Sequence, residues 1–356
     1  MTPTARLRFA ALGALLAGTA LVQAASTTTV FDVPAALLRT GRGTLPTGMN
    51  PSGDITGYYG LKKSFQGFIR NVDGQYTTFR AVKEAGTFPI SINGLRQTAG
   101  WYSRNDEGVP RGFLRDADGT VHTFDPVGMG GSYGTESLVV LDSGAIAGFY
   151  SDTNDVLHGF LRSPEGAVTV IDAPGAGTTA NLGTVVSNMD AKGVITGYYV
   201  GDDFVSHGFV RLTNGHIETF DIAGAADVTP QAINVKKTTA GFVTDENEVA
   251  HGFVRGKDGQ AELFDAPNSG TIAGQGTNGY TINSHGLSGG FTVDSNFAFH
   301  GFLRTPKGRI KPVDVEGAGT GANHGTLVQV INDAGMVMGI VIDDKGVNHG
   351  FVTTPD

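Results

Sequence analysis

The position just before a recurring Gly-Thr pair carries side chains that can bind or transform a ligand. It is occupied by Arg42, Tyr133, Gln275 and His324, and in the other repeats by Ala85, Leu182 and Ala226. Arginine neutralises a carboxylate such as that of a uronate sugar, and tyrosine or histidine can remove and return a proton. If these side chains face one opening, they form a polar ring around it. The alternative is that the position varies freely on the surface.

A second set of candidate residues lies in a basic segment of an acidic chain. Residues 39–115 hold 11 Lys and Arg against 5 Asp and Glu, a net charge of +6 in a chain of −9. Such asymmetry indicates an anionic partner. The segment provides cations for that partner and aromatic rings that can stack on a sugar: Arg42, Lys62, Lys63, Trp101, Tyr102 and Arg104. An ordinary solvated face is the alternative interpretation.

Five histidines precede a recurring Gly-Phe pair: His158, His207, His251, His300 and His349. Equivalent residues of successive repeats cannot converge on one metal, so we predict a structural role, with acidic loop residues such as Asp152 or Asp294 as hydrogen-bond partners. The recurring Arg of the same motif is predicted to pair between repeats. Asp-rich loops could bind calcium, but solvated turns are the preferred interpretation. We therefore expect no metal and no cofactor.

These residues are positioned by an internal repeat. The motif glycines follow one another at steps of 45, 47, 49, 44, 49 and 49 residues, the length of a propeller blade. Each repeat is predicted to contain four strands. The first ends near an Asn or Asp, the second has a Gly-aromatic-aromatic pattern, and the third contains the Gly-Phe motif. The fourth follows a tight turn and ends 12 residues beyond the motif glycine. The sequence predicts an all-β, seven-bladed β-propeller of four-stranded antiparallel blades.

The strand order also predicts how the ring closes. A strand over residues 28–32 precedes the first complete group, and the last group has no outer strand after it. The N-terminal strand should therefore pair with residues 349–353 and complete the C-terminal blade, which covers both exposed edges. An open β-solenoid is the alternative, and it leaves the first strand unexplained.

The repeat resembles a known family. The pattern His-Gly-Phe-x-Arg, then Phe-Asp-x-Pro-Gly-Ala, then Asn-x-x-Gly-x-Ile-x-Gly-x-Tyr is similar to the secreted bacterial HAF-type extracellular repeats, and the match covers nearly all of residues 27–353. The resemblance implies export and a propeller-like array. It implies no single activity and no catalytic residues. The chain departs from the pattern where Gln66 and Arg111 replace the motif His and Arg80 replaces the motif Asp.

The N-terminus predicts export. In residues 1–25, Arg6 and Arg8 precede an apolar stretch, and small residues lead to a cleavage site near Ala24 or Ala25, as in a signal peptide. A membrane anchor is the alternative, although the stretch is shorter than the ~20 residues of a spanning helix. Residues 26–356 are expected to form one domain. They are stabilised without disulfides, because the chain has no cysteine.

The charge and the motifs leave two functions open. Loss of Arg6 and Arg8 takes the net charge from −9 to −11, which disfavours nucleic acid and anionic membranes as partners. We expect a secreted monomer, periplasmic or extracellular, that binds an anionic polysaccharide or other carbohydrate ligand over the first two blades. The alternative is an enzyme acting on polysaccharides, a uronate lyase or hydrolase, with Arg42, Tyr133 and His324 at the channel mouth as catalytic candidates.

Overall fold

The computed structural model describes residues 27–104 and 108–354, and every regular element in these ranges is a β-strand. The expected signal peptide, residues 1–25, lies outside the described residues. None of the described segments forms a helix with the length and apolar character that a membrane span requires. The all-β prediction is confirmed.

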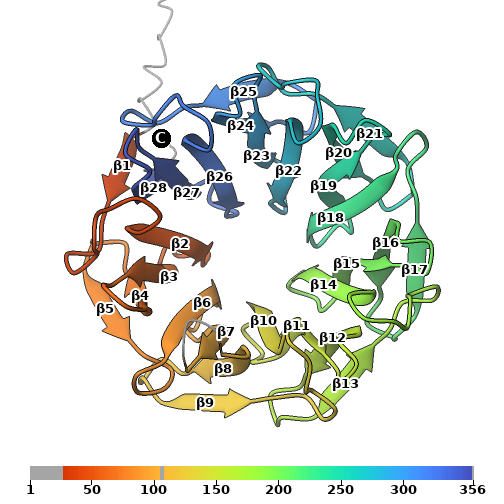
Figure 1. The fold of residues 1–356 in the computed structure, drawn as a ribbon, viewed down its shortest axis with the longest axis horizontal. Coiled ribbons are helices and arrows are strands. Elements are labelled where there is room, and N and C mark those ends of the chain that lie inside the picture. The colour runs from red at the N-terminus through yellow and green to blue at the C-terminus, as the bar shows by residue number, and fades with distance from the viewer. Residues whose placement is uncertain (1–26, 105–107, 355–356) are drawn as a thin grey trace, which may run out of the picture.

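The strands form antiparallel sets of four around a central opening (Figure 1). The innermost strands are β2 (Thr44–Met49), β6 (Gly86–Ile92), β10 (Thr135–Val140), β14 (Gly183–Met189), β18 (Asp227–Ile233), β22 (Gly276–Ile282) and β26 (Gly325–Ile331). The second strands are β3 (Ile55–Gly60), β7 (Thr98–Ser103), β11 (Ile146–Ser151), β15 (Ile195–Val200), β19 (Thr239–Thr244), β23 (Ser288–Val293) and β27 (Val337–Ile342).

The outer half of each set contains the motif strand and a short edge strand. The motif strands are β4 (Phe65–Arg70), β8 (Arg111–Arg115), β12 (Leu157–Arg162), β16 (Ser206–Arg211), β20 (Ala250–Arg255), β24 (Phe299–Arg304) and β28 (Asn348–Thr354). The outermost strands are β5 (Tyr76–Phe79), β9 (Val121–Phe124), β13 (Val168–Ile171), β17 (Ile217–Phe220), β21 (Ala261–Phe264), β25 (Ile310–Val313) and β1 (Thr27–Phe31).

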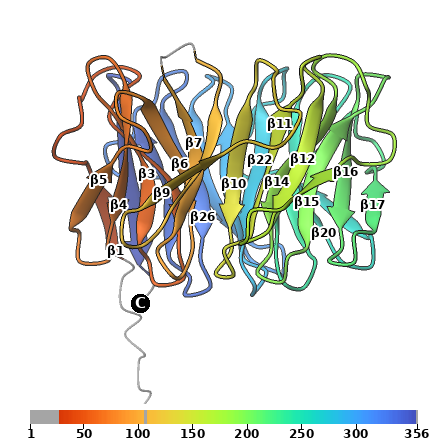
Figure 2. The same ribbon diagram turned by 90° about the horizontal axis from the view of Figure 1, so that it is seen from below.

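Side-chain packing holds neighbouring sets together. By hydrogen bonds the described strands fall into sheets of 12, 8, 4 and 4 strands, joined where single parallel bridges such as Leu157↔Gly183 link two sets. No hydrogen-bonded sheet among them runs round the whole opening. The strands run between the two flat faces of the molecule (Figure 2), so the loops gather on those faces.

The first and last strands lie side by side. β1 pairs with β28 from Thr27↔Thr354 to Phe31↔Gly350, as the unequal strand count predicts. Across the next junction, the guanidinium of Arg70 lies 4.8 Å from the centre of the Phe31 ring. On the face with the turns between first and second strands, Asn332 Nδ2 donates to the carbonyl oxygen of Asn50 at 3.2 Å, although 282 residues separate them.

The motif phenylalanine fills the core of each set. Its side chain is at most 1% exposed in all seven motifs: Phe68, Phe113, Phe160, Phe209, Phe253, Phe302 and Phe351. The motif arginine packs on the outermost strand of the preceding set. Arg162, for example, lies 4.8 Å from the centre of the Phe124 ring, a cation–π contact. Such contacts confirm the prediction that the motif arginines pair between repeats.

The Gly-Thr pair fixes the loop that leads into an inner strand. Gly183 has φ 120°, where side chains are rarely tolerated, and a Cβ there would collide with the carbonyl oxygen of Leu157. The fully buried hydroxyl of Thr184 accepts a hydrogen bond from the backbone N–H of Ala173 at 2.9 Å. These contacts hold the loop against the motif strand of the preceding set, so the residue before the pair sits at the end of a tightly fastened loop.

Candidate functional site

Four of the predicted cations line one pocket between the first two complete sets. Arg42, Lys62, Lys63 and Arg104 surround it, with Ser64, Glu84 and Gly86, and its volume is about 540 Å³. The cations come from three loops, those that follow β1, β3 and β7, and the loop that follows β5 contributes Glu84. We call this the basic pocket. The loops lie on one face because each connects strands at the same end of its set.

The cations of the basic pocket are unpaired with acids in the part of the chain that the structure describes. Among the described residues, none of the four cations forms an ion pair with a carboxylate, and the single acid, Glu84, pairs with the exposed Lys83 at 4.0 Å. The Arg42 guanidinium lies 4.3 Å from the centre of the Phe65 ring, and its buried Nη1 has no hydrogen-bond partner. The pocket therefore offers positive charge to an anion.

The two predicted aromatic residues are not part of the pocket lining. Tyr102 is only 6% exposed and packs with Ala85 and Phe113, so it is a core residue and presents no surface to a sugar. Trp101 stacks on Phe88 with ring centres 3.9 Å apart. Both side chains of strand β7 are therefore engaged in packing, Trp101 on β6 of its own set and Tyr102 in a core cluster.

The polar ring expected before the Gly-Thr pairs is not assembled around one pocket. Gln275 is 2% exposed and turned into its own loop, where Oε1 accepts from the N–H of Ile272. The Tyr133 hydroxyl donates to Asn181 Oδ1 at 2.8 Å on the third and fourth sets. Neither residue lines the basic pocket with Arg42. The position lies at the base of a fastened loop, so its side chains pack locally.

His324 lies next to the loop that carries Arg42 but outside the basic pocket. Its ring is beside Gly346, and the Gly346 carbonyl accepts a hydrogen bond from the N–H of Gly41 at 2.9 Å. The expected neighbourhood of His324 and the Arg42 loop is therefore present. The side chains that share the pocket with Arg42 are lysines and an arginine, and they do not include His324.

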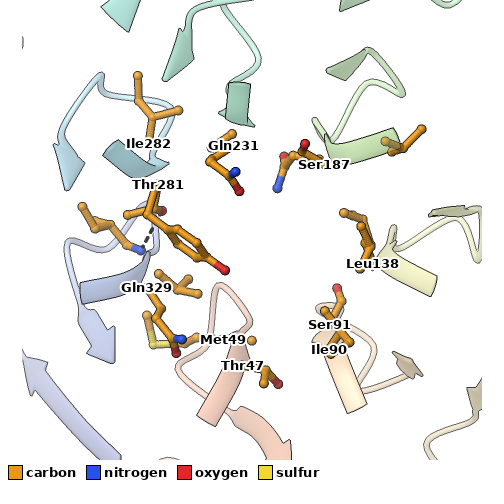
Figure 3. A pocket seen from close by; sticks show the side chains of 18 of the residues that line it. Thr47, Met49, Ile90, Ser91, Leu138, Ser187, Gln231, Thr281, Ile282 and Gln329 are labelled. Carbon is orange, nitrogen blue, oxygen red and sulfur yellow. Dashed lines mark hydrogen bonds between the residues drawn. The ribbon is translucent and has the colours of Figure 1, made fainter. Parts of the chain in front are cut away.

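The central channel contains a second cavity. Its volume is about 420 Å³, and it is lined by the middle residues of the inner strands, among them Thr47, Ser91, Ser187, Gln231 and Gln329 (Figure 3). No Asp, Glu, Lys or Arg is part of this lining. A β-bulge recurs in each inner strand, for example between Ser137 and Val139 in β10, and bulges redirect side chains. Here they bring polar residues into the channel.

The motif histidines bind aspartates on both sides. His158 Nδ1 lies 2.7 Å from Asp172 Oδ1, at the end of the outermost strand, and its Nε2 lies 3.8 Å from Asp152 of the preceding loop. The same two-sided contact recurs at His207, His251, His300 and His349. The predicted loop partners Asp152 and Asp294 are confirmed as neighbours. The nearer partner, the strand-end aspartate, was missed, although it follows the histidine by 14 residues in four of the five repeats. In the fifth it is Asp32, beside the N-terminal strand.

The departures from this motif compensate one another. Arg111 in the histidine position forms an ion pair with Asp125 at 2.7 Å. In the repeat where Gln66 replaces the histidine, Arg80 replaces the aspartate and donates to the carbonyl oxygen of Ala85. The position thus serves to fasten the loop to the motif strand. Among the described residues, no three His, Asp or Glu side chains gather as metal ligands do.

The last histidine joins the two ends of the fold and is expected to make stability depend on pH. The hydrogen bond to Asp32 raises the pKa of His349, and contact with Asp343 adds to it. A histidine whose pKa is raised in the folded state stabilises the fold at pH values below its unfolded pKa of about 6.5. This contribution is lost as the pH rises through the pKa of the folded state. His349→Gln should therefore cost most near pH 5.5 and least above pH 8, measured by urea unfolding at each pH. An equal cost at both would contradict this assignment.

Comparison with known proteins identifies the fold only. No protein-family model and no curated protein matches the chain. Among solved structures, the chain is similar to virginiamycin B lyase from Staphylococcus aureus. The similarity to its catalytically inactive variant with quinupristin has 12% identity and a TM-score of 0.58, and the similarity to its selenomethionine form has 12% identity and a TM-score of 0.59. Each comparison covers 92% of this chain and 99% of the lyase chain. It also matches TolB from Acinetobacter baumannii at 11% identity and a TM-score of 0.43, over 84% of this chain and 79% of that one. The chain forms four-stranded sets around an opening, and together with this arrangement the likeness to the lyase shows that the chain has a β-propeller fold.

Proposed function

We propose that this protein is an extracellular binding module that holds an anionic polysaccharide in the basic pocket. The observation that carries the proposal is the convergence of four cations from three loops on one pocket, without an ion-pair partner among the described residues. The signal-like residues 1–25 and the resemblance to HAF-type repeats support export. An acidic glycan supplies repeated carboxylates or sulfates, which match several cations on one face better than a single small anion does.

We also propose that the four-strand sets are the seven blades of a closed propeller. The pairing of β1 with β28 and the bond from Asn332 to Asn50 support this closure. In a closed ring the loops of the first two blades keep a fixed spacing, so the basic pocket is preorganised. Preorganisation matters here because it lowers the entropy cost of holding several cations in one place.

A glycan-binding assay on the mature protein tests the proposed function. Polygalacturonate, alginate and glucuronan should bind in isothermal titration calorimetry at low salt, whereas neutral dextran should not. Replacing Lys62, Lys63 and Arg104 together by Ala should weaken binding at least ~tenfold, because three positive charges that can pair with the glycan are removed. Binding by the native protein should weaken as salt rises to 0.3 M, since salt screens exposed charges.

The matched control removes the same charge from the opposite face. Lys236, Lys237 and Lys257 line another pocket, reached from the turns at the other ends of the strands, and their triple Ala variant should bind as the native protein does. Equal loss in both variants would show that overall charge, and not the basic pocket, is responsible. Lack of binding to every acidic glycan would overturn the proposal. Release of unsaturated oligosaccharides would point to a lyase.

A further inference from the structure

The central cavity is lined by a ring of bulge residues that the proposed function does not use. In every inner strand, the pairing with the second strand skips one residue, which is the extra residue of the β-bulge. All seven skipped residues line the cavity, and each is half-buried or exposed. They are Thr47, Ile90, Leu138, Ser187, Gln231, Tyr280 and Gln329. Each inner strand therefore presents one side chain to the channel at an equivalent position (Figure 3).

The ring of bulge residues has a polar arc and an apolar arc. The polar arc comes from five sets that follow one another around the opening, since β26 and β2 are neighbours (Figure 1). It consists of Ser187, Gln231, Tyr280, Gln329 and Thr47. The apolar arc is formed by Ile90 and Leu138 of the two remaining sets, which also contact each other through β6 and β10. A molecule in the channel therefore meets hydroxyls and amides on one side and hydrocarbon on the other.

Most of the polar arc is free to bind a ligand. Among the described residues, three of its side chains form no hydrogen bond: Ser187, Gln231 and Tyr280. The buried Oε1 of Gln329 has no hydrogen-bond partner either. Thr47 differs, because its hydroxyl donates to the carbonyl oxygen of Pro89 at 2.7 Å. A buried acceptor without a donor costs free energy, and a hydroxyl of a ligand can supply the missing donor to Gln329.

We propose that the central channel is a binding site for a small, uncharged, polyhydroxylated molecule of the size of a mono- or disaccharide. The site is separate from the basic pocket, because the two linings share no residue. The proposal goes beyond the proposed function and does not depend on it, since it rests on different residues and on hydrogen bonding rather than on charge.

The lining of the cavity disfavours a charged ligand. Among the described residues that form it, none is Asp, Glu, Lys, Arg or His. An ion that enters such a site gives up its hydration and meets no opposite charge. A neutral molecule rich in hydroxyls avoids this cost, because the side chains of the polar arc replace its hydrogen bonds to water.

The size and the two arcs of the site suit a sugar ring. The volume of about 420 Å³ is in the range of small-molecule sites. Gln231 and Gln329 come from the sets on either side of that of Tyr280, and each amide offers both a donor and an acceptor, as neighbouring hydroxyls require. The side chain of Tyr280 is 41% exposed, and its ring provides an apolar body beside a hydroxyl. The hydrocarbon face of a sugar ring can pack on this ring and on the apolar arc.

The test uses the mature protein with neutral sugars and their charged counterparts. Glucose, galactose, mannose, maltose and cellobiose are titrated at neutral pH and followed by saturation-transfer NMR and calorimetry. At least one should bind, and the corresponding uronate and 2-amino sugar should bind at least ~tenfold more weakly, because the lining offers them no opposite charge.

Two variants locate the binding in the channel. Replacing Gln231 and Gln329 together by Leu should weaken sugar binding at least ~tenfold, because two amides that can bond the ligand are lost. The melting temperature should hold or rise, since neither amide bonds another described residue. Ser187→Phe, which places a ring in the cavity, should abolish binding.

Two controls make each outcome decisive. Gln260→Leu removes the same amide from the exposed turn between β20 and β21 and should leave sugar binding unchanged. The Ala variant of Lys62, Lys63 and Arg104 should also keep it, so that failure of glycan binding and failure of this proposal are distinguishable. The proposal is overturned if none of the neutral sugars binds, if the charged counterparts bind equally well, or if the double Leu variant or Ser187→Phe binds as the native protein does.

Discussion

Deletion of residues 26–33 should leave the protein largely unfolded at temperatures where the native protein is intact. The deletion removes Phe31 and Val33, which are 7% and 2% exposed in the core shared by the first and last sets. It also removes the strand that pairs with β28. Each lost large side chain costs about 2–5 kcal/mol, so the total approaches the ~5–15 kcal/mol stability of a typical domain.

The deletion is measured by thermal unfolding against a protein that begins at residue 26. A synthetic peptide of residues 26–34 added in excess should restore part of the lost stability, since the groove beside β28 and the ring of Tyr59 remain available to it. If the truncated protein melts at the native temperature, β1 is dispensable and the proposed closure is wrong.

Phe209→Ala should lower the free energy of unfolding by about 3–5 kcal/mol. The Phe209 ring is fully buried and packs with Val186 and Ile195 of its own set and Ile171 of the preceding one. Its loss leaves a cavity between two sets, which the strands cannot close because their registers are fixed by hydrogen bonds. Urea unfolding at neutral pH measures the effect.

Phe204, five residues earlier, is the matched control. It is the same residue type but 75% exposed, with φ 64° in a loop. Phe204→Ala should change stability by no more than about 0.5 kcal/mol. Similar losses in both variants would mean that the motif phenylalanine does not carry the core and that the repeat is stabilised by other contacts.

The scaffold could be predicted because its determinants repeat. A single glycine-phenylalanine motif recurs with a hairpin of constant length, and hairpin register is fixed by the pleat. The pairing of β1 with β28 followed from strand order alone. The strand-end aspartate partners of His158, His207, His251 and His300 were also readable from a constant spacing of 14 residues, which the prediction of loop partners overlooked.

The candidate site could be predicted only in part. Four of the cations of residues 39–115 converge on the basic pocket, because loops of neighbouring sets share a face, which strand order implies. The residues before the Gly-Thr pairs do not converge, because whether such a side chain packs under its loop depends on local volume: Leu182 and Gln275 are buried, whereas Tyr133 is exposed.

The distribution of the histidine–aspartate contacts divides the molecule into two arcs with different responses to acid. Five successive repeats carry the histidine, and the two that replace it with Gln66 and Arg111 are the two that form the basic pocket. Within the histidine arc, the pKa of His349 is raised by its hydrogen bond to Asp32, and the pKa of His207 is raised because its contacts with Asp221 and Asp203 outweigh burial. Acidification therefore adds protons to this arc at those two histidines. Towards mildly acidic conditions the arc becomes less negative, which favours its contact with a long anionic chain that leaves the basic pocket.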